Sequence, residues 1–248
     1  MHTKAIKTTP IEANHSLTAL LDEYVPPLKE GTILAISSKV VSLCEGRIVS
    51  HEKASSKYPL IQQEADAILE ASSNPYDLYL TLIHGILIPS AGVDESNCRE
   101  NHVLYPQDPQ RSANQIWEYL RERDELIHVG VILTDSRSTP LRRGVLGFAL
   151  SWCGFNPLRS YVGKPDIYGK DLRTTQMNCV DALAASAVLV MGEGAEQTPI
   201  VLLTDVPSIE FLVRPPLEEE TNYFKVPMKE DLYAPLLQSA KWIHRIPS

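Results

Sequence analysis

Three short apolar runs rich in β-branched residues constrain the fold of this 248-residue chain most. They cover residues 32–36, 129–133 and 199–203, and runs of this length and composition are typical of buried strands. The first run leads into a predicted turn at 37–39, and the second ends at Thr134 and Asp135. Polar side chains just past the end of a strand are well placed to face a ligand.

Helical patterns are expected over residues 17–24, 60–71, 112–124 and 181–191. Asp108 followed by Pro109 is a start signal for the third helix, and Gly192 closes the fourth. Glu193 is therefore expected in a loop. A Pro-rich segment at 214–220 leads to a last helical stretch over 231–243, interrupted at Pro235, from which Trp242 is expected to dock on the body of the protein.

The composition indicates an ordinary soluble globular protein, with 44% hydrophobic and 22% charged residues. No signal peptide or membrane-spanning run is evident, which favours a cytoplasmic location. The four cysteines form no CxxC pair and are expected to be buried free thiols, and Cys98 is interpreted as structural. His84, between apolar residues, is interpreted as a strand residue and not as a ligand.

The charge distribution favours small anionic ligands. A net charge of −8 argues against nucleic acid as a partner. Residues 137–173 nevertheless carry seven basic side chains against two acidic ones. A basic segment in an acidic chain favours nucleotide phosphates or carboxylates as ligands, although a solvated surface with unrelated ion pairs explains the charge equally well.

Three acidic patches flanked by small residues carry the chemistry. They lie at 90–97, 133–136 and 191–194, and contain Asp94, Asp135 and Glu193. Each offers a hard oxygen ligand beside backbone that can approach a phosphate, as in proteins that hold Mg²⁺ or Mn²⁺ on a nucleotide. Taken singly, each has an ordinary explanation as a turn, a helix cap or a solvated loop.

Six segments resemble the coenzyme F420-0:L-glutamate ligase family in order and spacing. They are SSKVVS at 37–42 with EGR at 45–47, AGVDESN at 91–97, PQDP at 106–109 with SA at 112–113, TD at 134–135, GKPDIYGKDL at 163–172, and DALA at 181–184 through MG at 191–192. The likeness covers residues 3–205. Residues 206–248 lie outside it, as an extension expected to end in a helix.

The resemblance implies an α+β fold with mixed sheets, flanking helices and two intimately associated subdomains. It implies a ligase that joins L-glutamate to a carboxylate at the expense of GTP, with two Mg²⁺ or Mn²⁺ ions per site, a K⁺ ion, and a site built in a homodimer. Asp94 and Asp135 match the shared metal ligands of the family, and Ser136 and Glu193 match the ligands of the second cation. Neither a P-loop nor a GxGxxG motif is present.

Further positions carried over from the family concern the nucleotide and the substrates. The nucleotide positions are Thr9, Pro10, Ile11, Ser37, Ser38, Ser42, Asn97, Met191, Gly192, Gly194, Ala195, Glu196, Gln197 and Thr198. Hydroxyl groups and amides next to glycine are suited to binding phosphate oxygens. Arg142, Arg143 and Lys164 are expected to engage a substrate carboxylate or phosphate.

Departures from the family pattern leave the acceptor open. Ser136 stands where the family has Thr, and Val162 stands where an Arg is common, which removes a bidentate partner for an anion. The acceptor is therefore coenzyme F420-0, a related acid or a folate. Two further alternatives are a nucleotide-binding homologue without turnover and a metal-dependent phosphohydrolase.

Overall fold

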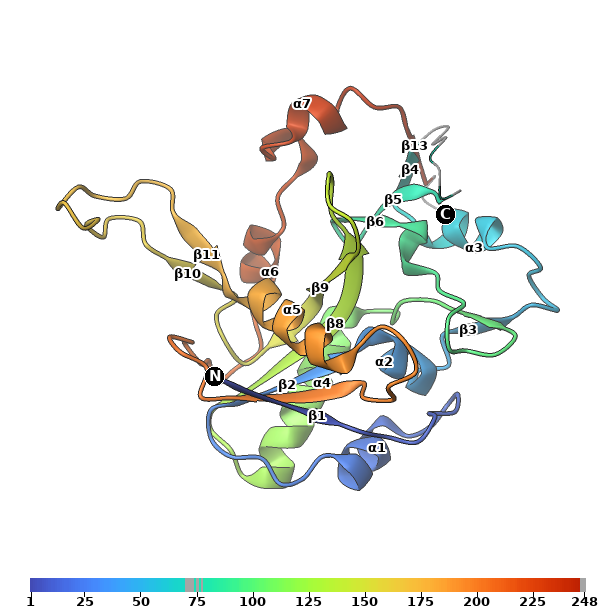
Figure 1. The fold of residues 1–248 in the computed structure, drawn as a ribbon, viewed down its shortest axis with the longest axis horizontal. Helices are drawn as coiled ribbons and strands as arrows, with labels where there is room; N and C mark the ends of the chain where they lie inside the picture. Colours follow the sequence, from blue (N-terminus) through green and yellow to red (C-terminus); the bar gives the residue numbers. More distant parts are fainter. Residues whose placement is uncertain (70–73, 75, 77, 246–248) are drawn as a thin grey trace.

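The computed structural model describes residues 1–69, 74, 76 and 78–245. A central five-stranded sheet has the order β1-β12-β2-β8-β9 (Figure 1). Its strands are β1 (His2–Ile6), β12 (Ile200–Thr204), β2 (Thr32–Ser37), β8 (Val129–Ser138) and β9 (Val145–Cys153). The three predicted strands are confirmed, but β8 continues past Asp135 to Ser138 after a register shift at Leu133/Thr134.

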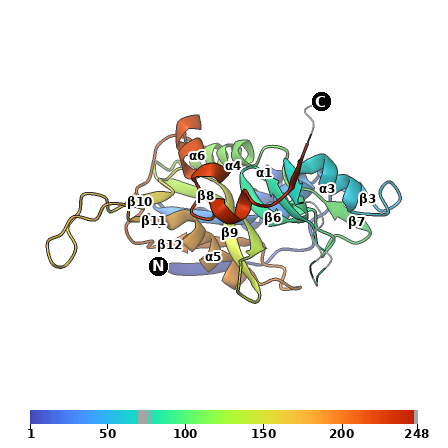
Figure 2. The ribbon, with the colours of Figure 1, turned by 90° about the horizontal axis from the view of Figure 1, so that it is seen from above.

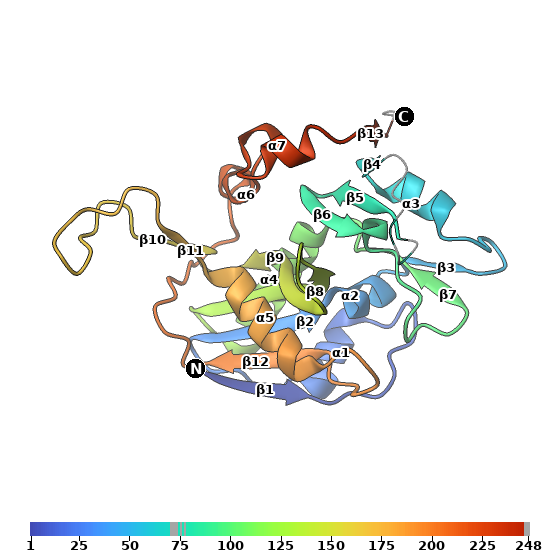
Figure 3. The same cartoon turned by 45° about the horizontal axis from the view of Figure 1, so that its top comes forward.

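Helices cover both faces of this sheet. Helix α5 (Cys179–Met191) packs on one face, and α4 (Pro109–Asp124) packs on the other (Figure 3). Successive β2 side chains point to opposite faces, so Ile33 belongs to the apolar cluster under α5, and Leu34 to the cluster on the other face, which includes residues of α4 and α1 (Leu17–Tyr24). Both faces are buried, which explains why β2 reads as a continuous apolar run.

A second group of strands lies beside the central sheet. Antiparallel β13-β4-β5-β6 consists of β13 (Trp242–His244), β4 (Ala67–Leu69), β5 (Leu80–Ile83) and β6 (Ile86–Pro89), and a two-stranded ribbon joins β3 (Ile48–Ser50) to β7 (Asn101–Val103). Ile83 and Ile88 belong to the same apolar cluster as Leu34 of the central sheet. One continuous core therefore joins both groups in an α+β fold.

The predicted helix over 60–71 is wrong in its second half. Helix α3 (Tyr58–Glu64) has a proline in its first turn and ends at Glu64, with Ala65 as its extended C-cap. The following residues form β4, because Ala67 and Ile68 pair with β5 on one side and with β13 on the other. Residues 70 and 71 lie outside the described residues.

The predicted C-terminal helix over 231–243 is also wrong. The chain forms α6 (Glu218–Phe224), a 3₁₀ turn η2 (Met228–Glu230), the short helix α7 (Ala234–Leu237) and then strand β13. Pro235 fits only the first turn of a helix, and the edge of β4 accepts the last residues as a strand. Trp242 docks on the body as expected, since it pairs with Leu69 of β4. Its indole N–H donates to the carbonyl oxygen of Leu237 (2.8 Å).

The hairpin β10 (Leu158–Ser160) and β11 (Gln176–Asn178) carries a long arm that projects from the body (Figure 2).

All four cysteines are free, and Cys44 alone is only half-buried. The interpretation of His84 as a strand residue is wrong, because it lies in the β5–β6 turn at φ 53°. Among the described residues, no helix combines the length and apolarity needed to cross a bilayer.

Candidate functional site

Strands β2 and β8 run parallel, with Ser37 opposite Thr134. Their carboxyl ends therefore meet at one edge of the central sheet. The turn expected at 37–39 is instead the start of helix α2 (Ser38–Cys44), because Ser37 takes the extended N-cap conformation and the apolar side chains of Val40 and Val41 are buried. This correction places Lys39 in the first turn of α2, beside the end of β8.

Asp94 and Asp135 line the same pocket, a hollow of about 230 Å³ at this edge. Asp94 follows the tight turn η1 (Ser90–Gly92) and is held by a two-bond antiparallel bridge to Val103 (3.0 and 2.8 Å). Asp135 lies on β8 beyond its register shift. Ser38 and Tyr105 also line the pocket. Two carboxylates from distant parts of the sequence thus share one cavity.

Asp94 is held as a carboxylate by hydrogen bonds. Lys39 Nζ lies 2.5 Å from Asp94 Oδ2 and also donates to the backbone and side-chain oxygens of Ser96, both at 2.9 Å. The Ser96 amide donates to Asp94 Oδ1 (2.8 Å). Burial raises the pKa of Asp94, but the bonds from Lys39 and Ser96 outweigh it and leave the pKa below its usual value. Asp94 is therefore ionised at neutral pH.

Asp135 lacks such a cation. Burial raises its pKa to about 6, the nearby charge of Asp94 acts in the same direction, and a hydrogen bond from the Tyr105 hydroxyl opposes both. Within the described part of the chain, no lysine or arginine forms an ion pair with Asp135. A buried carboxylate beside a second carboxylate is a site whose charge a divalent cation would balance, and oxygen is the ligand that Mg²⁺ and Mn²⁺ prefer. The residues therefore fit a divalent metal.

The third acidic patch adjoins the same edge. Ser136 Oγ donates to Glu193 Oε2 (3.2 Å), and Asn97 Nδ2 donates to the carbonyl oxygen of Gly194 (3.0 Å). Gly192 closes α5 at φ 77°, as expected, so Glu193 lies in the following loop. These two bonds join the 191–198 loop to the end of β8 and to the loop that carries Asp94.

The remaining nucleotide positions lie at differing distances from this pocket. Ser42 lines it, but its buried hydroxyl donates to the carbonyl oxygen of Ser38 (2.9 Å) and so is already bonded. Thr9, at the start of the 9–11 segment, bonds the Tyr24 hydroxyl (2.8 Å), and the preceding Thr8 donates its amide to Gln197 (2.9 Å). Within the 191–198 loop, Glu196 accepts the amide of Gly194 and Thr198 donates to Met191, while Ala195 is exposed.

The basic residues assigned to substrate do not line the aspartate pocket. Arg142 and Arg143 are exposed at the tip of the β8–β9 hairpin. Lys164 belongs to the β10–β11 arm, with its ammonium 5.5 Å from the centre of the Tyr161 ring. The pocket is lined instead by Arg137, which stacks on Phe148 at 4.7 Å. The substrate roles of Arg142, Arg143 and Lys164 stay predictions.

A second pocket, of about 850 Å³, is larger than the aspartate pocket. It lies between β10, β11, the 208–212 segment and α6, and both Arg159 and Lys164 line it. Asp94 and Asp135 do not. The size of a pocket therefore does not identify the acidic site. Its position at the carboxyl ends of the parallel strands β2 and β8 identifies it.

Two pocket residues were missed by sequence reasoning. Lys39 lies in the expected turn and in the SSKVVS segment but received no role from the sequence, although a lysine one residue into a helix after a buried strand faces the same edge as the strand's end. Tyr105 directly precedes the PQDP motif and carried no signal of its own, because its role depends on β8 lying beside it.

Comparison with known proteins gives one family. The family model described as F420-0:Gamma-glutamyl ligase matches residues 5–205. The chain belongs to this family. A relative from Methanopyrus kandleri is 36% identical over 193 residues, which is 71% of this chain and 75% of the relative. It is named coenzyme F420:L-glutamate ligase.

Two more relatives of this F420-0:gamma-glutamyl ligase family member carry the same name. One, from Archaeoglobus fulgidus, is 34% identical over 208 residues, covering 78% of this chain and 82% of the relative. Another, from Methanococcus maripaludis, is 32% identical over 208 residues, covering 78% and 83%. The match confirms the resemblance seen in the six motifs.

Proposed function

We propose that this chain is a GTP-driven ligase that forms an amide between L-glutamate and the carboxylate of an acceptor, with coenzyme F420-0 or a related acid as the acceptor. The observation that carries this proposal is the convergence of Asp94 and Asp135 on one pocket at the carboxyl ends of β2 and β8. The names of the relatives supply the acceptor and the amino acid.

The proposed chemistry explains why such a pocket is needed. A carboxylate is a poor acceptor for an amine because its oxygen does not leave. Its oxygen therefore first attacks the γ-phosphorus of GTP, and GDP leaves; the amine of glutamate then attacks the acyl phosphate, loses a proton, and inorganic phosphate leaves. Phosphoryl transfer depends mainly on positioning and on neutralising charge. Two Mg²⁺ or Mn²⁺ ions, with K⁺ as a further cation, would supply that neutralisation when bound.

In this proposal Asp94 and Asp135 hold the shared divalent ions, and Ser136 with Glu193 complete the second position. The Ser136–Glu193 contact supports this pairing, because both oxygens already lie together at the mouth of the site (3.2 Å). Lys39 pairs with Asp94 in the metal-free protein. We assign it to a phosphate oxygen once a metal takes over Asp94, because an ammonium group is a good point-charge partner for phosphate.

A homodimer would give the exposed hairpins a role. Arg142, Arg143 and Lys164 lie on projecting segments that do not line their own chain's aspartate pocket. In a homodimer these segments are available to a second copy, where they would meet substrate carboxylate or phosphate. The long β10–β11 arm supports this assignment.

The test is incorporation of glutamate. The purified protein is incubated with Mn²⁺ and glutamate, together with either GTP or ATP and with either F420-0 or a folate. The masses of the products are measured by mass spectrometry. We expect F420-0 to gain one glutamyl unit with GTP. Asp94→Ala should abolish the gain without unfolding the protein, and Asp205→Ala, which removes an exposed aspartate that lies 3.7 Å from His2, is the matched control.

Other outcomes are equally decisive. Addition of a glutamyl unit to the folate but not to F420-0 would favour a folate ligase instead. Nucleotide binding without turnover would favour a non-catalytic homologue, and phosphate release without any need for glutamate would favour a phosphohydrolase. Normal turnover by Asp94→Ala would overturn the assignment of the metal ligands.

A further inference from the structure

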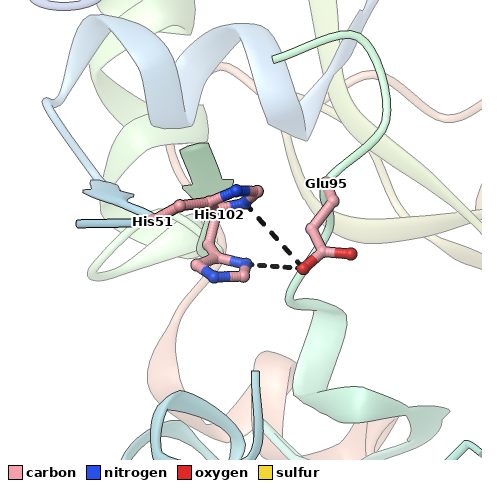
Figure 4. Close-up of side chains that lie close together, drawn as sticks. All are labelled: His51, Glu95 and His102. Atoms are coloured by element: carbon pink, nitrogen blue, oxygen red, sulfur yellow. Dashed lines mark ion pairs between the residues drawn. The ribbon is translucent and has the colours of Figure 1, made fainter. Parts of the chain in front are cut away.

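We propose that His51, Glu95 and His102 form a binding site for a transition-metal ion of the Zn²⁺ type, separate from the paired aspartates. The three side chains meet beside the β3–β7 ribbon, with both imidazole rings directed at one carboxylate (Figure 4). This inference is independent of the proposed ligase activity, because it rests on different side chains.

The backbone explains why the three residues meet. His102 lies on β7 opposite Val49 of β3, and His51 follows β3 with its amide donating to the carbonyl oxygen of Glu100 (3.1 Å). On the other side of β7, the bridge between Asp94 and Val103 places Glu95 next to His102. Three neighbouring extended segments thus each contribute one ligand.

The hydrogen bonding of His102 points to a cation. Its Nε2 lies 2.9 Å from the carbonyl oxygen of Ala54, which can only accept, so Nε2 carries the hydrogen. In a neutral ring Nδ1 then carries the lone pair. His102 is 1% exposed, and its Nδ1 lies 3.0 Å from Glu95 Oε1 yet has no hydrogen bond of acceptable geometry among the described residues. Two acceptors that face each other, with the imidazole buried and the carboxylate 39% exposed, are stabilised by a cation between them, which is either a proton or a metal ion.

The distances suit a metal after a small adjustment. His51 Nε2 lies 4.0 Å from Glu95 Oε1, and the three ligand atoms lie within 4.8 Å of one another. Ligands of tetrahedral zinc lie roughly 3.3 Å apart, given metal–ligand distances of about 2.0–2.2 Å. The His51 side chain is 42% exposed and free to turn inward. Its exposure also leaves a fourth position for water.

Neighbouring groups favour a zinc-like ion with one bond from the carboxylate. Lys57 Nζ lies 2.8 Å from Glu95 Oε2, so Oε1 is the oxygen that faces the imidazoles. The Ala54 carbonyl and Lys57 would act as outer partners that orient the ligands. Two imidazoles with one carboxylate suit Zn²⁺ better than Mg²⁺, which prefers oxygen alone.

The test is direct metal binding by the full chain. Chelator-treated protein in excess Mg²⁺ is titrated with Zn²⁺ against a chromophoric chelator, and with Co²⁺ as a spectroscopic probe. We expect one Zn²⁺ per chain and the visible absorption bands of tetrahedral Co²⁺. His51→Ala should weaken Zn²⁺ binding by more than about tenfold. His128→Ala is the matched control, because His128 is an exposed histidine 3.5 Å from Glu30, and among the described residues no second imidazole pairs with that carboxylate.

Two further variants make the result specific. Glu95→Gln keeps the volume of the side chain and should also lose Zn²⁺, whereas Asp135→Asn should keep it. Absence of Zn²⁺ binding, or equal binding by His51→Ala and His128→Ala, would overturn the proposal. The rival explanation is a proton: if nitrogen NMR at pH 8 shows His102 protonated on both nitrogens with or without Zn²⁺, the cluster is an ion pair and not a metal site.

Discussion

The hydroxyl of Tyr105 donates a hydrogen bond to the carboxylate of Asp135, and this contact joins two residues that lie 30 positions apart in the sequence. The Tyr105 ring packs directly over Gly92, where an added Cβ would lie 2.2 Å from the ring carbon that bears the hydroxyl. A glycine at 92 is therefore required for two reasons: its φ of +70° and the approach of the ring.

Gly92→Ala should destabilise the protein by roughly 2–5 kcal/mol, because left-handed strain and overpacking add. Gly144→Ala is the matched control: Gly144 also has a positive φ (+89°), but nothing lies within 4 Å of its added Cβ. Strain alone predicts a loss of about 1–2 kcal/mol there. Urea unfolding at pH 7 measures both, and equal losses would show that Tyr105 does not need the space above Gly92.

Asp135→Asn should stabilise the metal-free protein at pH 8 by about 1–3 kcal/mol. Burial raises the pKa of Asp135 in the folded state from 3.8 to about 6. A carboxyl group whose pKa is higher in the folded state than in the unfolded state stabilises the folded state when it is protonated. This contribution is complete below pH 3.8 and is lost as the pH rises through about 6. In EDTA, the free energy of unfolding of Asp135→Asn should therefore exceed that of the wild type at pH 8, and this difference should become smaller near pH 5. Added Mg²⁺ should stabilise the wild type only, and an equal gain at both pH values would contradict the assigned pKa.

Lys39→Met should tighten Mg²⁺ binding in the absence of nucleotide and weaken binding of GTP. The ammonium of Lys39 lies 2.5 Å from Asp94 and competes with a metal for that carboxylate. Isothermal titration with Mg²⁺ and then with GTP separates the two effects. Lys53→Met, at an exposed position outside the pocket, is the control. Weaker Mg²⁺ binding in Lys39→Met would mean that Lys39 organises Asp94 for the metal.

Arg47→Met should cost about 2–4 kcal/mol, because it leaves Glu64 partly buried without its cation. Arg47 Nη2 lies 2.5 Å from Glu64 Oε2, and Arg47 Nε donates to the carbonyl oxygen of Tyr105 (2.9 Å). Arg99→Met removes an exposed ion pair with Glu12 and should cost less than about 1 kcal/mol. Urea unfolding compares the two, and similar losses would show that the Arg47 pair acts like a surface pair.

Local patterns predicted the elements whose stability is local. Helix α4 follows its Asp108 cap and Pro109, and the side chain of Asp108 accepts the amide of Arg111 as a helix cap does (3.0 Å). Strand β4 and strand β13 were missed because each reads as part of a helix when taken alone. Their strand conformation comes from pairing with each other across more than 170 residues, a contact that no local window contains.

The residues of the site also divide into those that sequence patterns mark and those whose roles depend on distant contacts. Asp94, Asp135, Ser136 and Glu193 were found because small flanking residues and a family pattern mark them in the sequence. Tyr105, His51 and His102 carry no such mark, and Lys39 lies in a family segment without a role assigned to it. The roles of all four depend on which oxygen lies opposite each of them. A lone histidine or lysine in a sequence has no partner until the chain folds.

The sequence by itself determined the family, the buried strands of the central sheet and the residue types able to hold a hard cation, because apolar periodicity and motif spacing are properties of the chain. Only the tertiary structure decided which charges face one another: Lys39 against Asp94, Tyr105 against Asp135, and two imidazoles against Glu95. Electrostatic effects fall steeply with distance and depend on burial, so a side chain's chemistry is set by spatial neighbours, and here most of these lie far away along the chain.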